Sequence, residues 1–152
     1  MSTMKTLATV LTCTFLLGAF ATVAAADPGR GADIQCYVWA NNATSTLNAP
    51  YSPSSPYSFN TVGRSAANFV TRTATGSYSV TCKGVGGGSL FTGSGTWGAG
   101  GHVQVTAYGS EDADYCKVSS WTTGGADFTA FVRCYNSAGA LSDSRFDLLF
   151  VW

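Results

Sequence analysis

Polarity alternates along one seven-residue run, Phe128-Thr129-Ala130-Phe131-Val132-Arg133-Cys134, in which every even-numbered residue is apolar. Successive side chains of a β-strand point to opposite faces, so the run predicts a strand with one buried face. Further alternating or apolar segments occupy residues 34–39, 69–71, 77–82, 102–108, 115–121 and 145–152. No segment repeats apolar residues at helical spacing over three turns. We therefore expect an all-β fold, a compact antiparallel β-sandwich or small barrel of about seven to eight strands.

Cysteine gives a second indication of the fold. The chain has five, and Cys13 falls within the apolar amino-terminal run described below, which leaves Cys36, Cys82, Cys116 and Cys134. An even number of cysteines in an exported chain favours two disulfides. Zinc is the alternative partner for four cysteines, but the sequence lacks the C-x2-C pair that is typical of zinc sites.

The residues next to the cysteines favour one of the three pairings. A C-x-V motif begins at Cys36 and again at Cys116, and a V-x-C motif ends at Cys82 and again at Cys134. If a C-x-V strand pairs antiparallel with a V-x-C strand so that the cysteines are opposite, the valines are opposite too, on the same face. This register predicts the disulfides Cys36–Cys82 and Cys116–Cys134, each between adjacent strands.

Residues 1–26 have the pattern of a signal peptide. Lys5 precedes an apolar run over residues 7–20, and Ala24-Ala25-Ala26 offers a small-residue cleavage site. The run is shorter than the roughly 20 residues that a membrane-spanning helix needs. We expect cleavage after Ala26, leaving residues 27–152 as a single secreted β domain, extracellular or periplasmic, with no membrane span.

Charge excludes two classes of protein. Lys and Arg number 8, Asp and Glu number 8, and charged residues make up 11% of the chain, whereas hydrophobic residues make up 45%. A chain this apolar and weakly charged is not intrinsically disordered. Nor does it have the basic excess with which proteins neutralise phosphates, so we expect no nucleic-acid partner.

Aromatic residues, 13% of the chain, are the main resource for binding. Tyr37 and Trp39 alternate out of phase with Cys36, so they face outward. Residues 48–57 form a proline-containing segment, expected to be extended, and residues 84–101 form a glycine-rich loop. Aromatic faces beside amides stack on sugar rings. The predicted ligand-binding residues are Trp39, Tyr37, Tyr51, Tyr57 and Trp97; the alternative is that these rings cover a second core face or a neighbouring subunit.

Residues suited to catalysis are sparse. His102 is the only histidine, and it falls on the predicted outward face of a strand. Asp127 and Asp147 are candidates for paired carboxylates only by elimination. Asp143 is a third, although Asp143 and Arg145 are more simply interpreted as a turn-stabilising pair. We therefore predict no catalytic residue and no cofactor.

One acidic cluster raises the question of a metal. Glu111, Asp112 and Asp114 could supply carboxylate oxygens to calcium, but they lack the spacing of a calcium-binding loop. A solvated turn is the simpler interpretation, and we predict no metal site.

Four short motifs fall on the expected strands and turns of the second half of the chain: VQVTAYG at residues 103–109, C-x-V-x-x-W at 116–121, V-x-C at 132–134 and DSRF at 143–146. Together they resemble a group of small exported bacterial proteins, which often carry such units in tandem. The resemblance covers roughly residues 37–152. It implies bacterial export and a compact β fold. It implies no catalytic residue, because the group has no established activity.

These observations favour a secreted, non-enzymatic binding module whose partner is a polysaccharide or an extracellular protein at a cell surface. Two alternatives are a structural or interaction protein of the envelope or extracellular matrix, and an inhibitor of a secreted hydrolase that inserts one of the two loops. A small hydrolase built on His102 or the aspartates is the least favoured.

Overall fold

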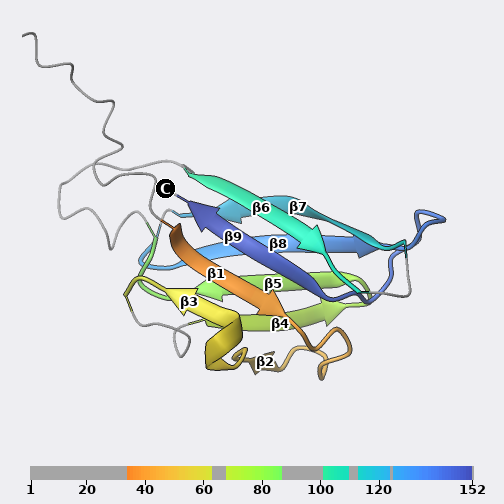
Figure 1. Ribbon diagram of the computed structural model, residues 1–152, viewed down its shortest axis with the longest axis horizontal. Coiled ribbons are helices and arrows are strands. Elements are labelled where there is room, and N and C mark those ends of the chain that lie inside the picture. The colour runs from red at the N-terminus through yellow and green to blue at the C-terminus, as the bar shows by residue number, and fades with distance from the viewer. Residues whose placement is uncertain (1–33, 63–67, 87–100, 110–112, 124, 152) are drawn as a thin grey trace, which may run out of the picture.

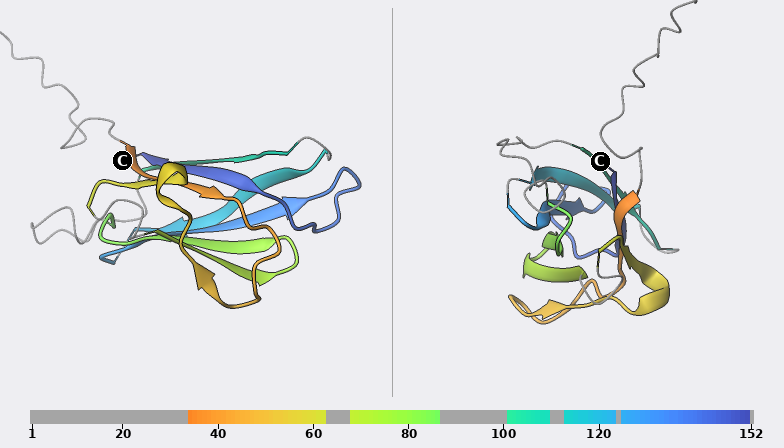
Figure 2. Two further views of the ribbon diagram at one scale, coloured as in Figure 1. Left: turned by 60° about the horizontal axis from the view of Figure 1, so that its bottom comes forward. Right: turned by 90° about the vertical axis from the view of Figure 1, so that its left-hand side faces the viewer.

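The structure is a computed structural model that describes residues 34–62, 68–86, 101–109, 113–123 and 125–151. Nine strands form two antiparallel sheets that pack face to face (Figures 1 and 2). Sheet A has the order β3 (Ser58–Asn60), β1 (Ile34–Ala40), β9 (Phe146–Val151), β6 (His102–Ala107). Sheet B has the order β2 (Pro50–Tyr51), β4 (Asn68–Ala74), β5 (Ser77–Cys82), β8 (Phe128–Tyr135), β7 (Tyr115–Thr122).

The predicted all-β sandwich is confirmed, with more strands than the seven or eight expected. The additional pairing comes from the proline-containing segment and the residues just after it: β2 adds to β4 at one edge of sheet B, and β3 adds to β1 at one edge of sheet A. Pro50 is tolerated in β2 because an edge strand need not donate every N–H to a neighbour. Between them Ser55–Tyr57 form a single 3-10 turn, η1. The predicted signal peptide, residues 1–26, lies outside the described residues.

The apolar residues of the alternating segments form the core between the two sheets. Phe128, Ala130 and Val132 of β8 are fully buried or nearly so, and they face Phe146, Leu148 and Phe150 of β9. The rings of Phe128 and Phe150 stack across the core with centroids 4.0 Å apart. β9 is an inner strand of sheet A, between β1 and β6. None of the helical structure in the described residues is long and apolar enough to cross a membrane.

Both predicted disulfides are present, but the register argument is right for only one. Cys116 and Cys134 are directly opposite on β7 and β8, with Cα atoms 4.0 Å apart. Cys36 and Cys82, however, lie on β1 and β5, which belong to different sheets, and their Cα atoms are 6.4 Å apart. They are joined across the core rather than along a ladder. The loops of 46 and 18 residues that the bridges close correspond to about 4 and about 3 kcal/mol.

A buried pair of asparagines joins the two sheets at the edge where β3 lies. Asn60 on β3 donates to the side-chain oxygen of Asn68 on β4 at 3.0 Å and to the Lys83 carbonyl at 3.0 Å. Asn68 in turn donates to the Ser58 hydroxyl and the Phe59 carbonyl, both at 2.8 Å. Asn60 is 1% exposed and Asn68 is fully buried, so these hydrogen bonds form without competition from water. The pair fixes β3 against sheet B.

Candidate ligand-binding face

Aromatic side chains gather on the outer face of sheet A, the side away from the core. Val38 and Ala40 of β1 are buried, so Tyr37 and Trp39 point outward. Tyr37 is directly opposite Phe59 of β3, and Trp39 lies next to Tyr57, which immediately precedes that strand. Tyr108, just after β6, completes the group on the other side of Trp39. We call these five rings the aromatic platform: Tyr37, Trp39, Tyr57, Phe59 and Tyr108.

Trp39 is the centre of the platform. Its ring stacks on Tyr57 with centroids 5.1 Å apart and an interplanar angle of 23°. It meets Tyr37 edge-on at 6.0 Å and Tyr108 in a tilted arrangement at 5.8 Å. Tyr57 is 39% exposed and Phe59 is 42% exposed, whereas Trp39 is half-buried between its neighbours. Trp39 therefore supports the platform, and Tyr57 and Phe59 offer most of its free surface.

A carboxylate lies within the platform. Asp147 of β9 is directly opposite Trp39 on one side and Thr106 of β6 on the other. Burial raises the pKa of the Tyr37 hydroxyl, and the charge of Asp147 raises it further. Burial also raises the pKa of Tyr108, and the charge of Asp147 adds to this, while the positive charge of Arg145 partly opposes both. Both hydroxyls therefore stay protonated at neutral pH and can donate hydrogen bonds beside a carboxylate that accepts them.

A polar pocket of about 430 Å³ adjoins the platform at Tyr108. Its walls come from the chain after β1, from the end of β6 and the residues after it, from the residue before β7 and from the chain before β9. The Arg145 guanidinium carbon lies 5.4 Å from the centre of the Tyr108 ring, the geometry of a cation–π contact. The polar groups of the pocket are Asn41, Asn42, Thr44, Asp114, Asp143, Ser144 and Arg145. Amides, hydroxyls and charges thus line the pocket directly beside exposed rings.

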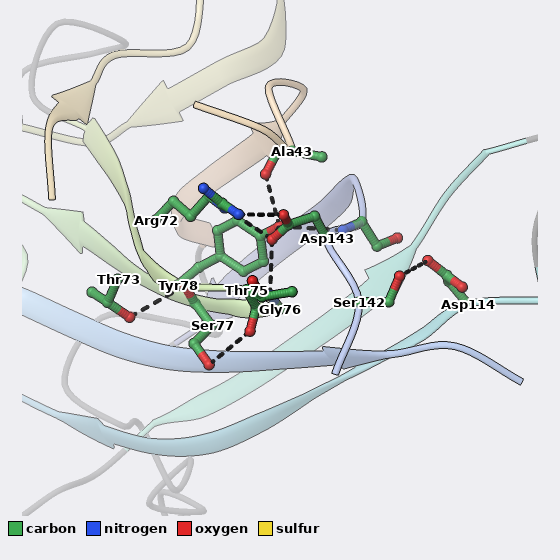
Figure 3. A network of polar contacts seen from close by, with 11 residues as sticks. Ala43, Arg72, Thr73, Thr75, Gly76, Ser77, Tyr78, Asp114, Ser142 and Asp143 are labelled. Carbon is green, nitrogen blue, oxygen red and sulfur yellow. Dashed lines mark hydrogen bonds and ion pairs between the residues drawn. The ribbon is translucent and has the colours of Figure 1, made fainter. Parts of the chain in front are cut away.

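Asp143 holds the wall of this pocket in place (Figure 3). Its carboxylate accepts two hydrogen bonds from the Arg72 guanidinium, one of them at 2.9 Å from Nε, and another from the Gly76 N–H at 2.8 Å. The Tyr78 hydroxyl lies 3.1 Å from the same carboxylate and 2.9 Å from the Ala43 carbonyl oxygen. The chain before β9 is therefore anchored to the turn between β4 and β5 and to the chain after β1.

Hydrogen bonding also sets the charge of Asp143. Burial alone would raise the pKa of its carboxyl, but the hydrogen bonds from Arg72, Gly76 and Tyr78 outweigh burial and lower that pKa below the ordinary 3.8. The expected pair of Asp143 with Arg145 is wrong. Asp143 is bound to Arg72, 71 residues earlier, because the hairpin that carries Arg72 folds against the chain before β9, and Arg145 lies over Tyr108 instead.

Of the five aromatic residues predicted to bind a ligand, the structure brings three together: Tyr37, Trp39 and Tyr57. Tyr51 lies on β2, where its ring packs against the core. Its hydroxyl accepts a hydrogen bond from the Asn42 N–H at 3.2 Å and interacts electrostatically with Tyr108, so Tyr51 borders the pocket rather than the stacked rings. Trp97 lies outside the described residues.

The other residues considered for chemistry are dispersed. His102 begins β6 and is exposed. Asp127 accepts hydrogen bonds from Lys83 and from the Gly84 N–H, just after β5, whereas Asp143 is bound to Gly76, just before β5. These two carboxylates therefore lie at opposite ends of one strand. Within the described residues no group of three metal-ligating side chains is close enough to hold a metal ion.

Sequence reasoning missed Tyr108, Phe59 and the part played by Asp147. The signal for Tyr108 is its phase, because it follows His102, Gln104 and Thr106 on the outward positions of β6. Phe59 has no such signal, since it lies on the short strand β3, just after the proline-containing segment, where the sequence predicted no strand. Comparison of the chain with models of protein families, with curated proteins and with solved structures found no match.

Proposed function

We propose that this protein is an exported, non-enzymatic module that binds neutral polysaccharide on the outer face of sheet A. The observation that carries the proposal is the aromatic platform, five rings on one face with Tyr57 and Phe59 more than a third exposed. Soluble proteins seldom leave contiguous apolar surface uncovered unless it binds something. The two disulfides fit an oxidising compartment outside the cytoplasm.

The chemistry of the platform favours sugars over a purely apolar partner. A pyranose ring has an apolar C–H face, which stacks on an aromatic ring, and an edge of hydroxyls, which needs donors and acceptors. Asp147 offers a hydrogen-bond acceptor in the middle of the platform, and the Tyr37 and Tyr108 hydroxyls offer donors to a sugar's hydroxyl groups. Asn41, Asn42 and Arg145 extend this polar rim into the adjoining pocket, where a further sugar unit fits.

A fluorescence titration tests the proposal. The full chain is produced with export, and its tryptophan emission is followed against cellohexaose, xylohexaose and chitohexaose. We expect a saturable shift with at least one hexasaccharide, because Trp39 is in contact with three of the other rings. A flat response to all three contradicts the proposal.

Three variants locate the binding site. Tyr57→Ala removes one exposed ring and should weaken binding about threefold to tenfold, since an aromatic contact contributes about 0.5–1.5 kcal/mol. Asp147→Asn keeps the shape of the side chain and should weaken binding about tenfold by removing a charged acceptor. Trp121→Phe is the matched control, because Trp121 is also exposed but lies on β7 in sheet B. Equal losses in all three variants would place the ligand elsewhere.

A further inference from the structure

We propose a second binding site on the outer face of sheet B, for an acidic polysaccharide. Its centre is the pair Lys117 and Arg133, which are directly opposite on β7 and β8. Like charges directly opposite in a sheet repel one another and destabilise the pairing. Neither cation forms a salt bridge within the described residues, whereas Arg72 and Lys83 each have an aspartate partner. A bound anionic group relieves the repulsion that the fold leaves in place.

The described strands around the pair carry no negative charge. The outward positions of β5 are Ser77, Ser79 and Thr81, and no Asp or Glu occurs within β4, β5, β7 or β8. The face as described is therefore composed of hydroxyls, aromatic rings and two positive charges. Although the net charge of the whole chain is zero, this face is positive.

A hollow of about 380 Å³ lies beside Arg133. Phe131, which is 44% exposed, contributes an aromatic wall, and Thr73, Ser77 and Ser120 contribute polar groups. An aromatic wall and hydroxyls suit a sugar ring, and the Arg133 guanidinium suits a carboxylate or sulfate bound through two of its N–H groups.

Next to the hollow, a pair of rings extends the surface. Tyr115 stacks on Tyr135 with centroids 5.3 Å apart, and the Lys117 ammonium lies 5.2 Å from the centre of the Tyr135 ring. Tyr115 is 49% exposed. Two cations are too few for the six to ten phosphate contacts with which proteins bind nucleic acid strongly, so an acidic polysaccharide is the occupant that this face fits.

Direct binding measurements with the exported full chain test the site. We expect heparin, which carries sulfate, or polygalacturonate, which carries carboxylate, to bind, and the difference between them identifies the preferred anion. Uncharged dextran should not compete with either. Failure of both polyanions, or tighter binding of oligo(dT) than of either, would overturn the inference. The neutral hexasaccharide titration on sheet A is a separate measurement, so either proposal can fail alone.

Two variants make the test specific. Arg133→Glu places a carboxylate opposite Lys117, so it should weaken polyanion binding at least tenfold. The melting temperature should stay unchanged or rise, because the two opposed charges then attract. Lys83→Gln is the matched control, since Lys83 is an exposed cation that is paired with Asp127 beyond the opposite end of the β5–β8 pair from Arg133. Unchanged polyanion binding by Arg133→Glu, or an equal loss in Lys83→Gln, would show that the charge pair is not the site.

Discussion

The two outer faces of the sandwich are both rich in exposed aromatic rings, but they differ in charge and in support. On sheet A the rings contact one another around a carboxylate, Asp147. On sheet B the rings flank two cations, Lys117 and Arg133. A chain with equal numbers of acids and bases can thus carry two faces of different chemistry, because the strand register, and not the composition, decides which charges lie together.

The two faces also differ in the contacts that hold them in place. Two polar networks hold the edges of the sheet A face: Asn60 with Asn68 fixes β3, and Asp143 fixes the chain that leads to Arg145. The β7–β8 part of sheet B depends on strand pairing and on the disulfide Cys116–Cys134. The platform on sheet A therefore depends on residues outside it. Two predictions below test these supporting residues, and a third compares the charges of the two faces.

Asn68→Ala should have the largest effect. The substitution removes the acceptor of Asn60 and leaves the Ser58 hydroxyl and the Phe59 carbonyl without their donor, at a cost of about 3 kcal/mol in the free energy of unfolding. Urea unfolding measures this cost. Binding to sheet A should weaken because β3 carries Phe59 and follows Tyr57, while polyanion binding to sheet B should stay unchanged.

Ser79→Ala is the control for that variant, since Ser79 lies on the outer face of the same sheet and is half-buried. Its unfolding free energy should change by less than about 0.5 kcal/mol. A similar loss in both variants would mean that the asparagine pair does not support β3 in particular.

Asp143→Asn should have an intermediate effect at pH 7, smaller than that of Asn68→Ala, because it leaves the partly buried Arg72 with a weaker partner. Since the pKa of Asp143 is lowered on folding, the unfolded chain takes up its proton first as the pH falls. The contribution of Asp143 is therefore complete above about pH 5, and it is lost as the pH falls through 3.8 toward the lower folded value.

Unfolding in urea at pH 7, 5 and 3 measures this contribution. The difference in stability between the natural protein and Asp143→Asn should shrink as the solution is acidified. Asp127→Asn is the control: the pKa of Asp127 is also lowered, mainly by its hydrogen bond from Lys83, but that pair is more exposed and so contributes less. A difference for Asp143→Asn that is constant with pH would contradict the account of its charge.

Salt should have the smallest effect and should separate the two faces most simply. Raising NaCl from 50 to 300 mM should weaken polyanion binding to sheet B about tenfold, as expected for the release of counterions from about two charge contacts. Binding of a neutral hexasaccharide to sheet A should change less than twofold. Isothermal titration calorimetry measures both, and an equal salt dependence would contradict the distinction between the faces.

The sequence predicted the features that depend on residues close together in the chain, namely the strands and the pairing of consecutive strands. Contacts between distant segments could not be predicted from it. Alternation predicted the strands, and the C-x-V and V-x-C motifs placed Cys116 opposite Cys134 because β7 and β8 are consecutive. The same motifs could not show that Cys36 and Cys82 face each other across the core, since both arrangements put cysteine and valine on one inward face.

The candidate site, too, combines residues that local sequence predicted with contacts between distant segments that it did not. Outward alternation on β1 was enough to choose Tyr37 and Trp39. Nothing local indicates that Asn68 meets Asn60 from the other sheet, or that Asp143 binds Arg72 rather than the neighbouring Arg145. Such contacts join segments that are far apart in the sequence, so only the three-dimensional structure reveals them.

The most direct test of the account is a residue-resolved NMR titration of the isotope-labelled, exported protein with the three neutral hexasaccharides. The account predicts saturable shifts that are confined to the platform and its pocket, strongest at Trp39, Tyr57 and Tyr108. Shifts confined to the outer face of sheet B, or no saturable shift with any of the three, would contradict the central claim that the platform on sheet A binds neutral polysaccharide.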